Sequence, residues 1–141
     1  MVKRILLVAV LLSALLAAVA CSERETRVEV TYGDFIDDQN ATREMSVPEG
    51  TMIDVALYSN PTTGFEWEDA DISNTAILQQ VDRRFLSPRG ESDPPTGSPG
   101  QDVFAFESIG KGQSTVTFHY SRPWEGGQRS VWTFTLLVNV E

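Results

Sequence analysis

Two short segments hold the residue types that are best suited to contact another protein. The first, residues 60–65, reads Asn-Pro-Thr-Thr-Gly-Phe and has no charged residue, although the chain as a whole is strongly acidic. Its hydroxyl side chains and its glycine would let the backbone lie close against a second surface. The second segment is Arg122-Pro123-Trp124. Tryptophan and arginine are enriched at binding hot spots, and the fixed φ of Pro123 stiffens their presentation.

A third segment, residues 87–101, contains four prolines and three glycines, and it is the longest irregular stretch of the chain. Its Gly97-Ser98-Pro99-Gly100 portion has the composition of a recognition loop, although a plain linker would have the same composition. The other two segments also have structural interpretations. Residues 60–65 could be an ordinary turn, and Trp124 could fold back onto the domain.

Catalytic chemistry is poorly represented in this sequence. The chain has one cysteine and one histidine, and Cys21 lies at a candidate processing site far from His119 in sequence. A Cys–His nucleophile pair is therefore not expected, and one histidine without a cysteine cluster argues against a zinc site. The sequence predicts a protein that is not an enzyme and that needs no metal or cofactor.

The elements that must position these loops are β-strands. Large apolar residues recur at every second position in residues 28–32, 53–57, 104–106, 116–120 and 132–140, and a less regular strand is expected within 76–85. No amphipathic helical stretch follows the first twenty residues. The pattern predicts an all-β, immunoglobulin-like sandwich of about seven antiparallel strands, with Trp132 on a core strand.

The order of these strands predicts where the loops lie. Alternate connections in a series of antiparallel strands fall at the same end. If residues 53–58 are the second strand, connections 59–64, 87–101 and 121–129 share one end of the sandwich, and the Gly110-Lys111-Gly112 turn lies at the other.

The N-terminus has the features of an export signal. Lys3 and Arg4 precede sixteen residues, 5–20, of which only Ser13 is polar. This apolar run is shorter than the ~20 residues of a membrane-spanning helix. Small residues directly before Cys21 resemble a bacterial lipobox, in which the cysteine is acylated; ordinary secretion with cleavage nearby is the alternative. We expect a lipoprotein signal peptide at 1–20, a lipidated tether at 21–26 and one domain at 27–141.

Charge and localisation follow from this division. Removing residues 1–20 takes two of the 11 basic residues and none of the 20 acidic ones, which leaves a formal charge of −11. Such a chain is poorly suited to bind nucleic acid. The expected protein is a monomer, exported and held by Cys21 on the extracytoplasmic side of a cell-envelope membrane.

The Asn-Pro-Thr-Thr-Gly-Phe and Arg-Pro-Trp segments, in this order and with a glycine-containing loop between them, resemble the signatures of the chagasin family. The resemblance covers roughly residues 27–141. It implies a reversible inhibitor of papain-like cysteine proteases, in which residues 60–65 enter the active-site cleft and residues 97–100 and 122–124 clasp its sides. The family's middle loop usually reads Gly-x-Gly-Gly, so Pro99 is a departure. The alternative is a non-inhibitory exported immunoglobulin-like lipoprotein that serves in adhesion.

Overall fold

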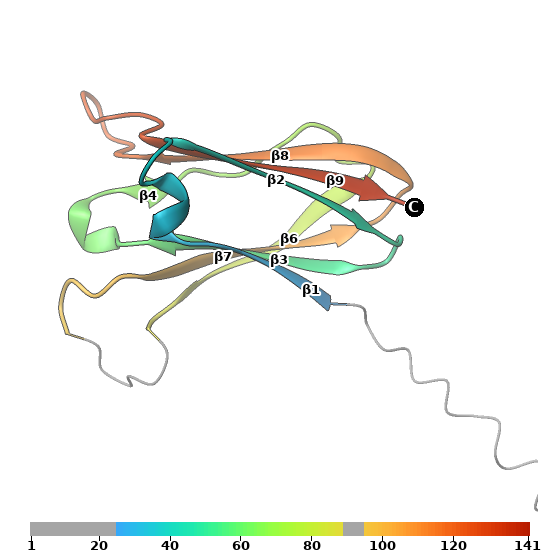
Figure 1. Ribbon diagram of the computed structural model, residues 1–141, viewed down its shortest axis with the longest axis horizontal. Helices are drawn as coiled ribbons and strands as arrows, with labels where there is room; N and C mark the ends of the chain where they lie inside the picture. Colours follow the sequence, from blue (N-terminus) through green and yellow to red (C-terminus); the bar gives the residue numbers. More distant parts are fainter. Residues whose placement is uncertain (1–24, 89–94) are drawn as a thin grey trace, which may run out of the picture.

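The computed structural model describes residues 25–88 and 95–141, and these form nine strands in two packed sheets (Figure 1). The predicted signal peptide, Cys21 and residues 89–94 lie outside the described residues. The strands are β1 Glu25–Val30, β2 Asn40–Val47, β3 Met52–Ser59, β4 Glu66–Trp67, β5 Asp71–Ile72, β6 Leu78–Leu86, β7 Gly100–Ser108, β8 Gly112–Ser121 and β9 Trp132–Val140. Two short 3₁₀ turns, η2 Tyr32–Phe35 and η3 Pro61–Thr63, complete the elements.

The sandwich that the sequence predicts is confirmed, with a more mixed topology than expected. One sheet has the order β1-β3-β7-β6, and the other has the order β2-β9-β8-β4, with β5 also paired to β8. The pairs β1–β3 and β2–β9 are parallel, while the other pairs are antiparallel. The N-terminal strands thus add one parallel edge to each sheet.

Strand β2 is absent from the sequence prediction. Of its eight residues only Ala41 and Val47 are buried, and the others include charged and hydroxyl side chains. An edge strand needs few core-facing residues, so its alternation is too weak to recognise. Strand β1 begins at Glu25, so residues 25–26, assigned above to the tether, belong to the strand.

The core lies between the sheets and consists mainly of aromatic and branched side chains. Its largest fully buried members are Trp67, Phe104, Phe106, Phe118 and Phe134. All buried core residues lie between positions 30 and 140, so a fragment that lacks the signal peptide contains the whole core.

Trp132 faces the core side, as its place in the alternating strand predicts, but it is only partly buried. It is the first residue of β9, where the sheets end and the loops begin. Its ring stacks on Tyr120 and on Phe35, each with a centroid distance of 4.9 Å. Trp132 therefore closes the end of the sandwich, and Trp67 is the tryptophan of the interior.

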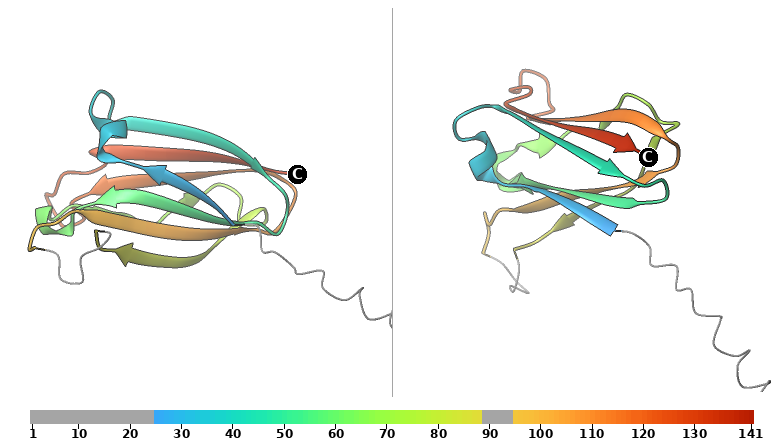
Figure 2. Two further views of the ribbon diagram at one scale, coloured as in Figure 1. Left: turned by 60° about the horizontal axis from the view of Figure 1, so that its bottom comes forward. Right: turned by 45° about the vertical axis from the view of Figure 1, so that its right-hand side comes forward.

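The described residues of connections 59–64, 87–101 and 121–129 lie at one end of the sandwich, which we call the loop pole (Figures 1 and 2). Residues 53–58 belong to the third strand and not the second, yet the prediction holds because β3, β6 and β8 all run toward this pole. The turn at 109–112, the turn at 48–51 and the C-terminus lie at the opposite end, the far pole.

This placement of the tryptophans predicts different effects on folding. Trp67 is 1% exposed and its Nε1 donates to the Tyr58 carbonyl at 2.8 Å, whereas Trp124 is 52% exposed. Trp67→Ala should lower the free energy of unfolding by about 3–5 kcal/mol because it leaves a large cavity. Trp124→Ala should change it by less than about 0.5 kcal/mol. Denaturant unfolding of the 22–141 fragment measures both, and equal losses would contradict this assignment.

Candidate functional site

The three loops at the loop pole are tied to one another by hydrogen bonds. The Asn60 side-chain Nδ2 donates to the Gly97 carbonyl at 3.2 Å, which joins the first loop to the middle one. Arg122 Nη2 donates to the Thr63 carbonyl at 3.2 Å, which joins the first loop to the third. Loop 60–65 therefore stands between the other two and holds them both.

Loop 60–65 is a tight 3₁₀ turn that satisfies its own polar groups. Pro61 occupies its first position, where the missing N–H costs nothing. The Thr63 hydroxyl donates to the Asn60 carbonyl and the Thr62 hydroxyl to Asn60 Oδ1, both at 2.7 Å. Pro61, Thr62 and Thr63 are exposed. The loop thus presents a small, uncharged and internally bonded tip.

Gly64 ends this turn, and its conformation requires glycine. It has φ +80° and ψ 0°, in the left-handed region, and its N–H donates to the Pro61 carbonyl at 3.0 Å. A Cβ here would lie 2.6 Å from Cη2 of Trp124. The indole therefore packs directly on the glycine, and a side chain at 64 would displace it.

The base of loop 60–65 rests on Tyr120. The Tyr120 hydroxyl accepts a hydrogen bond from the Asn60 backbone N–H at 3.0 Å. Phe65 is partly buried and stacks on the Tyr120 ring at 5.5 Å. Burial raises the pKa of Tyr120, so the hydroxyl stays neutral at physiological pH. Phe65, a predicted binding residue, thus packs inward and supports the loop.

Arg122 and Trp124 occupy the side of the loop next to Phe65. The Arg122 guanidinium carbon lies 4.4 Å from the Phe65 ring centroid and 5.9 Å from that of Trp124. Arg122 is partly buried, and its Nε has no hydrogen-bond partner among the described residues. The guanidinium therefore bridges two rings and the Thr63 carbonyl, and Trp124 is left as the exposed aromatic group.

Loop 122–131 is braced by a residue that the sequence analysis did not single out. Arg129 Nη2 donates to the Pro123 carbonyl at 2.9 Å, and its Nη1 lies 3.3 Å from Glu68 Oε1. A hydrogen bond from Ser121, with help from Arg129, holds the pKa of Glu68 below its usual value. No spacing in the sequence identifies Arg129, because its two partners precede it at unrelated intervals of 6 and 61 residues.

The middle loop contacts loop 60–65 through the carbonyl of Gly97. Gly97 is exposed at φ +94°, and the Ser98 N–H and hydroxyl both donate to the Pro95 carbonyl. Gly100, by contrast, is the first residue of β7 and pairs with Ser59. A Cβ at Gly100 would lie 2.4 Å from the Leu86 carbonyl oxygen, so this glycine has a packing role that its spacing did not reveal.

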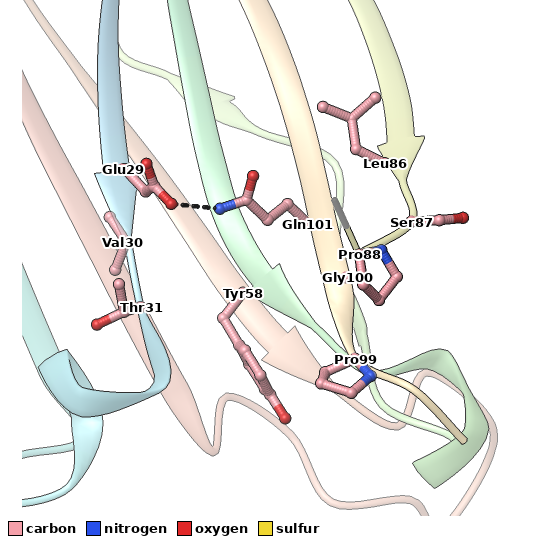
Figure 3. A pocket seen from close by; sticks show the side chains of 10 residues that line it. All are labelled: Glu29, Val30, Thr31, Tyr58, Leu86, Ser87, Pro88, Pro99, Gly100 and Gln101. Carbon is pink, nitrogen blue, oxygen red and sulfur yellow. Dashed lines mark hydrogen bonds between the residues drawn. The ribbon is translucent and has the colours of Figure 1, made fainter. Parts of the chain in front are cut away.

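Two hollows flank the loops. One, of about 340 Å³, lies on the outer side of the β1-β3-β7-β6 sheet. There Tyr58 lies between Thr31 and Pro99, and Gln101 donates a hydrogen bond to Glu29 (Figure 3). The other, of about 440 Å³, lies beneath loop 60–65, and its walls are mainly aromatic. Tyr32, Tyr58, Phe65, Tyr120 and Trp132 contribute rings to it. The loop pole is therefore apolar beneath its uncharged tip.

The one histidine of the chain contacts a threonine on the neighbouring strand. His119 Nδ1 lies 3.3 Å from Thr133 Oγ1, between strands β8 and β9. Among residues 25–88 and 95–141, no three His, Cys, Asp or Glu side chains are placed to hold a metal ion. None of the helical segments in the same ranges has the length and apolar character of a membrane span.

Comparison with known proteins places this fold and these loops in one family. The model of the chagasin family of peptidase inhibitors, I42, matches residues 46–138. Chagasin of Trypanosoma cruzi is 27% identical over 97 residues, which cover 67% of this chain and 86% of chagasin.

Solved structures agree on the fold. The cysteine protease inhibitor EhICP2 of Entamoeba histolytica superposes with a TM-score of 0.60 at 21% identity, covering 83% of this chain and 97% of that one. PbICP-C, solved in complex with falcipain-2, superposes with a TM-score of 0.57 at 13% identity, covering 84% and 99%. The chain belongs to the chagasin family of peptidase inhibitors.

Proposed function

We propose that the mature protein is a reversible inhibitor of papain-like cysteine proteases, and that it blocks their active-site cleft with the three loops of the loop pole. The observation that carries this proposal is the uncharged, internally bonded tip of loop 60–65, held between two other loops in a member of a peptidase-inhibitor family. The inhibitor acts as a monomer, because one copy of the chain carries all three loops.

The chemistry of loop 60–65 suits a thiol-protease cleft. A papain-like enzyme works through a thiolate–imidazolium pair in an open groove. A charged loop would bury an unmatched charge against this pair, whereas residues 60–65 bring none. The two threonine hydroxyls already donate within the loop, so entry into the cleft breaks few bonds to water.

The same turn resists cleavage. The carbonyls of Asn60 and Pro61 accept hydrogen bonds from the N–H groups of Thr63 and Gly64. A closed 3₁₀ turn of this kind offers no extended segment in which a carbonyl could be aligned with the attacking thiolate. The loop fills the groove as an inhibitor and not as a substrate.

Trp124 supplies binding energy on the side of the cleft that residues 122–124 contact. Its indole is half exposed and rests on Gly64, so it extends the tip of loop 60–65 with an apolar surface. Pro123 and the hydrogen bonds of Arg129 hold the loop in place before any partner arrives. Loops ordered in advance lose little conformational entropy on binding, which favours tight association. Residues 97–99 of the middle loop complete the contact on the opposite side.

We also infer that the protein is an exported lipoprotein that is acylated at Cys21. The support is the sequence alone: a basic start, an apolar run of sixteen residues and small residues before the lone cysteine. Two or more acyl chains hold a protein stably at a membrane, whereas one chain holds it only marginally.

The first prediction from the proposed function concerns the class of protease that is inhibited. The 22–141 fragment should inhibit papain reversibly, remain uncleaved and spare trypsin, because the uncharged loop fits a thiol-protease groove. Inhibition constants and gel analysis of the incubated fragment measure this. If several papain-like enzymes were unaffected at micromolar fragment, the adhesion lipoprotein would be the better account.

The second concerns Trp124. Trp124→Ala should weaken inhibition about thirtyfold, equivalent to ~2 kcal/mol, because a hot-spot side chain is removed. Gly64→Ala should weaken it comparably, since the added Cβ displaces the same indole.

Gly50 provides the matched control for Gly64. It has φ +81°, almost the value of Gly64, but no atom lies within 4 Å of a Cβ built there, and it sits at the far pole. Gly50→Ala therefore carries the same backbone strain without touching Trp124. Equal effects of Gly50→Ala and Gly64→Ala on the inhibition constant would show that lost stability, and not displacement of the Trp124 indole, is responsible.

The third concerns the anchor. Cys21→Ser in the full chain should move the protein from the membrane fraction to the soluble fraction, with its inhibition constant unchanged. Cell fractionation measures the first effect and a papain assay the second. Equal membrane association of the variant and the parent would contradict lipidation.

A further inference from the structure

We propose that the anchored protein stands on the membrane with its loop pole facing the aqueous compartment, so that its target is a soluble protease arriving from that compartment. This inference rests on the proposed inhibition and on the proposed lipid anchor, and it adds the direction in which the inhibitor works. The observations that carry it are the direction of β1, the length of the tether and the charge of the mature chain.

Strand β1 starts at the far pole. Its register with β3 is parallel, with Glu25 opposite Met52 and Val30 opposite Leu57. Because β3 runs from Met52 toward Ser59 and then enters loop 60–65, Glu25 lies at the end of the sheet that is distant from the inhibitory loops. Figure 1 shows β1 beginning near the C-terminus and away from these loops.

The height of the domain exceeds the reach of the tether. Strand β3 has eight residues and spans about 23 Å, and loop 60–65 extends beyond it. Four peptide steps separate Cys21 from Glu25, and fully extended they span at most about 14 Å. If the loops touched the bilayer, Glu25 would lie higher above the surface than this tether can reach. The inverted orientation is therefore excluded by geometry.

Charge disfavours the remaining alternative, in which the domain lies on its side. The mature chain has nine basic and 20 acidic residues, since two of the 11 basic residues precede Cys21. Glu25 and Glu29, on the strand nearest the anchor, are both exposed, and the exposed Arg27 between them lies 3.8 Å from Asp54, so this edge keeps a net negative charge. Anionic headgroups repel such a surface within a Debye length, so the domain is held off the membrane and upright on its tether.

The orientation of the domain determines which proteases the three loops can reach. Three loops presented more than about 20 Å above the bilayer meet a protease that diffuses freely in the compartment. A protease held against the same membrane, with its cleft near the headgroups, would lie below the level of the loops. The structure thus points to a soluble papain-like enzyme as the partner.

The test couples the mature chain, residues 21–141, through Cys21 to a maleimide lipid in vesicles of phosphatidylcholine and anionic phosphatidylglycerol that also contain a dansyl-labelled lipid. The inverted control carries Cys21→Ser and Glu125→Cys, and is coupled through the exposed position 125 of the loop pole. All three tryptophans lie at the loop pole: Trp67 and Trp132 each pair with Tyr120, and Trp124 is in loop 122–131. Energy transfer from tryptophan to the dansyl headgroups therefore reports the height of this pole.

Transfer should be severalfold weaker in the protein coupled through Cys21 than in the inverted control. Equal transfer in the two would overturn the proposal. This readout does not depend on inhibition, so it tests the orientation even if the protein inhibits no protease.

The second readout is inhibition of soluble papain by the coupled protein. Its inhibition constant should be within about twofold of that of the uncoupled Cys21→Ser chain. A Gly/Ser insert of about ten residues after Ser22, which adds roughly 17 Å of average reach, should change nothing. A loss of inhibition on coupling that this insert restores would overturn the upright orientation. Lack of inhibition by the uncoupled chain would instead overturn the proposed function.

Discussion

The ring of Tyr120 packs against Trp67 and Trp132, each at 4.9 Å, and against Phe65 at 5.5 Å, and its hydroxyl accepts a hydrogen bond from the Asn60 backbone N–H. This one side chain joins the buried core to the loop that carries the candidate function. A sandwich leaves its two ends open, because strands cover only the faces of the core. Here aromatic rings close one end, and the closing layer also serves as the platform on which loop 60–65 stands.

The loops above this platform are bonded to one another as well as to the strands. Asn60 reaches across to Gly97, and Arg122 reaches back to Thr63, so that neither flanking loop is independent of the central one. Arg122 bridges Phe65 and Trp124 through cation–π contacts, which lets a charged residue support an apolar tip. The division of roles follows from burial: partly buried residues position the loops, and the exposed Thr62 and Trp124 are left for a partner.

The two poles of the sandwich differ in kind. The loop pole holds three irregular connections, each of which contains proline, while the far pole holds short turns and the start of β1. Separation of this sort is a consequence of strand direction, since β3, β6 and β8 all end at the same pole. It keeps the start of β1, which follows the proposed anchor in sequence, apart from the three loops.

The amino-acid sequence by itself determined the fold class, because β8 and β9 each alternate on a local, two-residue period that can be recognised without knowledge of their partners. It also determined which loops carry unusual residues and that they share one end. The tertiary structure alone decided that residues 40–47 form a strand, since an edge strand buries too few side chains to show a pattern. It decided that Trp67 is interior while Trp132 closes the end, because both pair with Tyr120 and their different burial arises only from packing between the sheets. The contact between Gly64 and Trp124 joins residues 60 positions apart, and no local period encodes such a distance; it exists only once both loops are closed on the same platform.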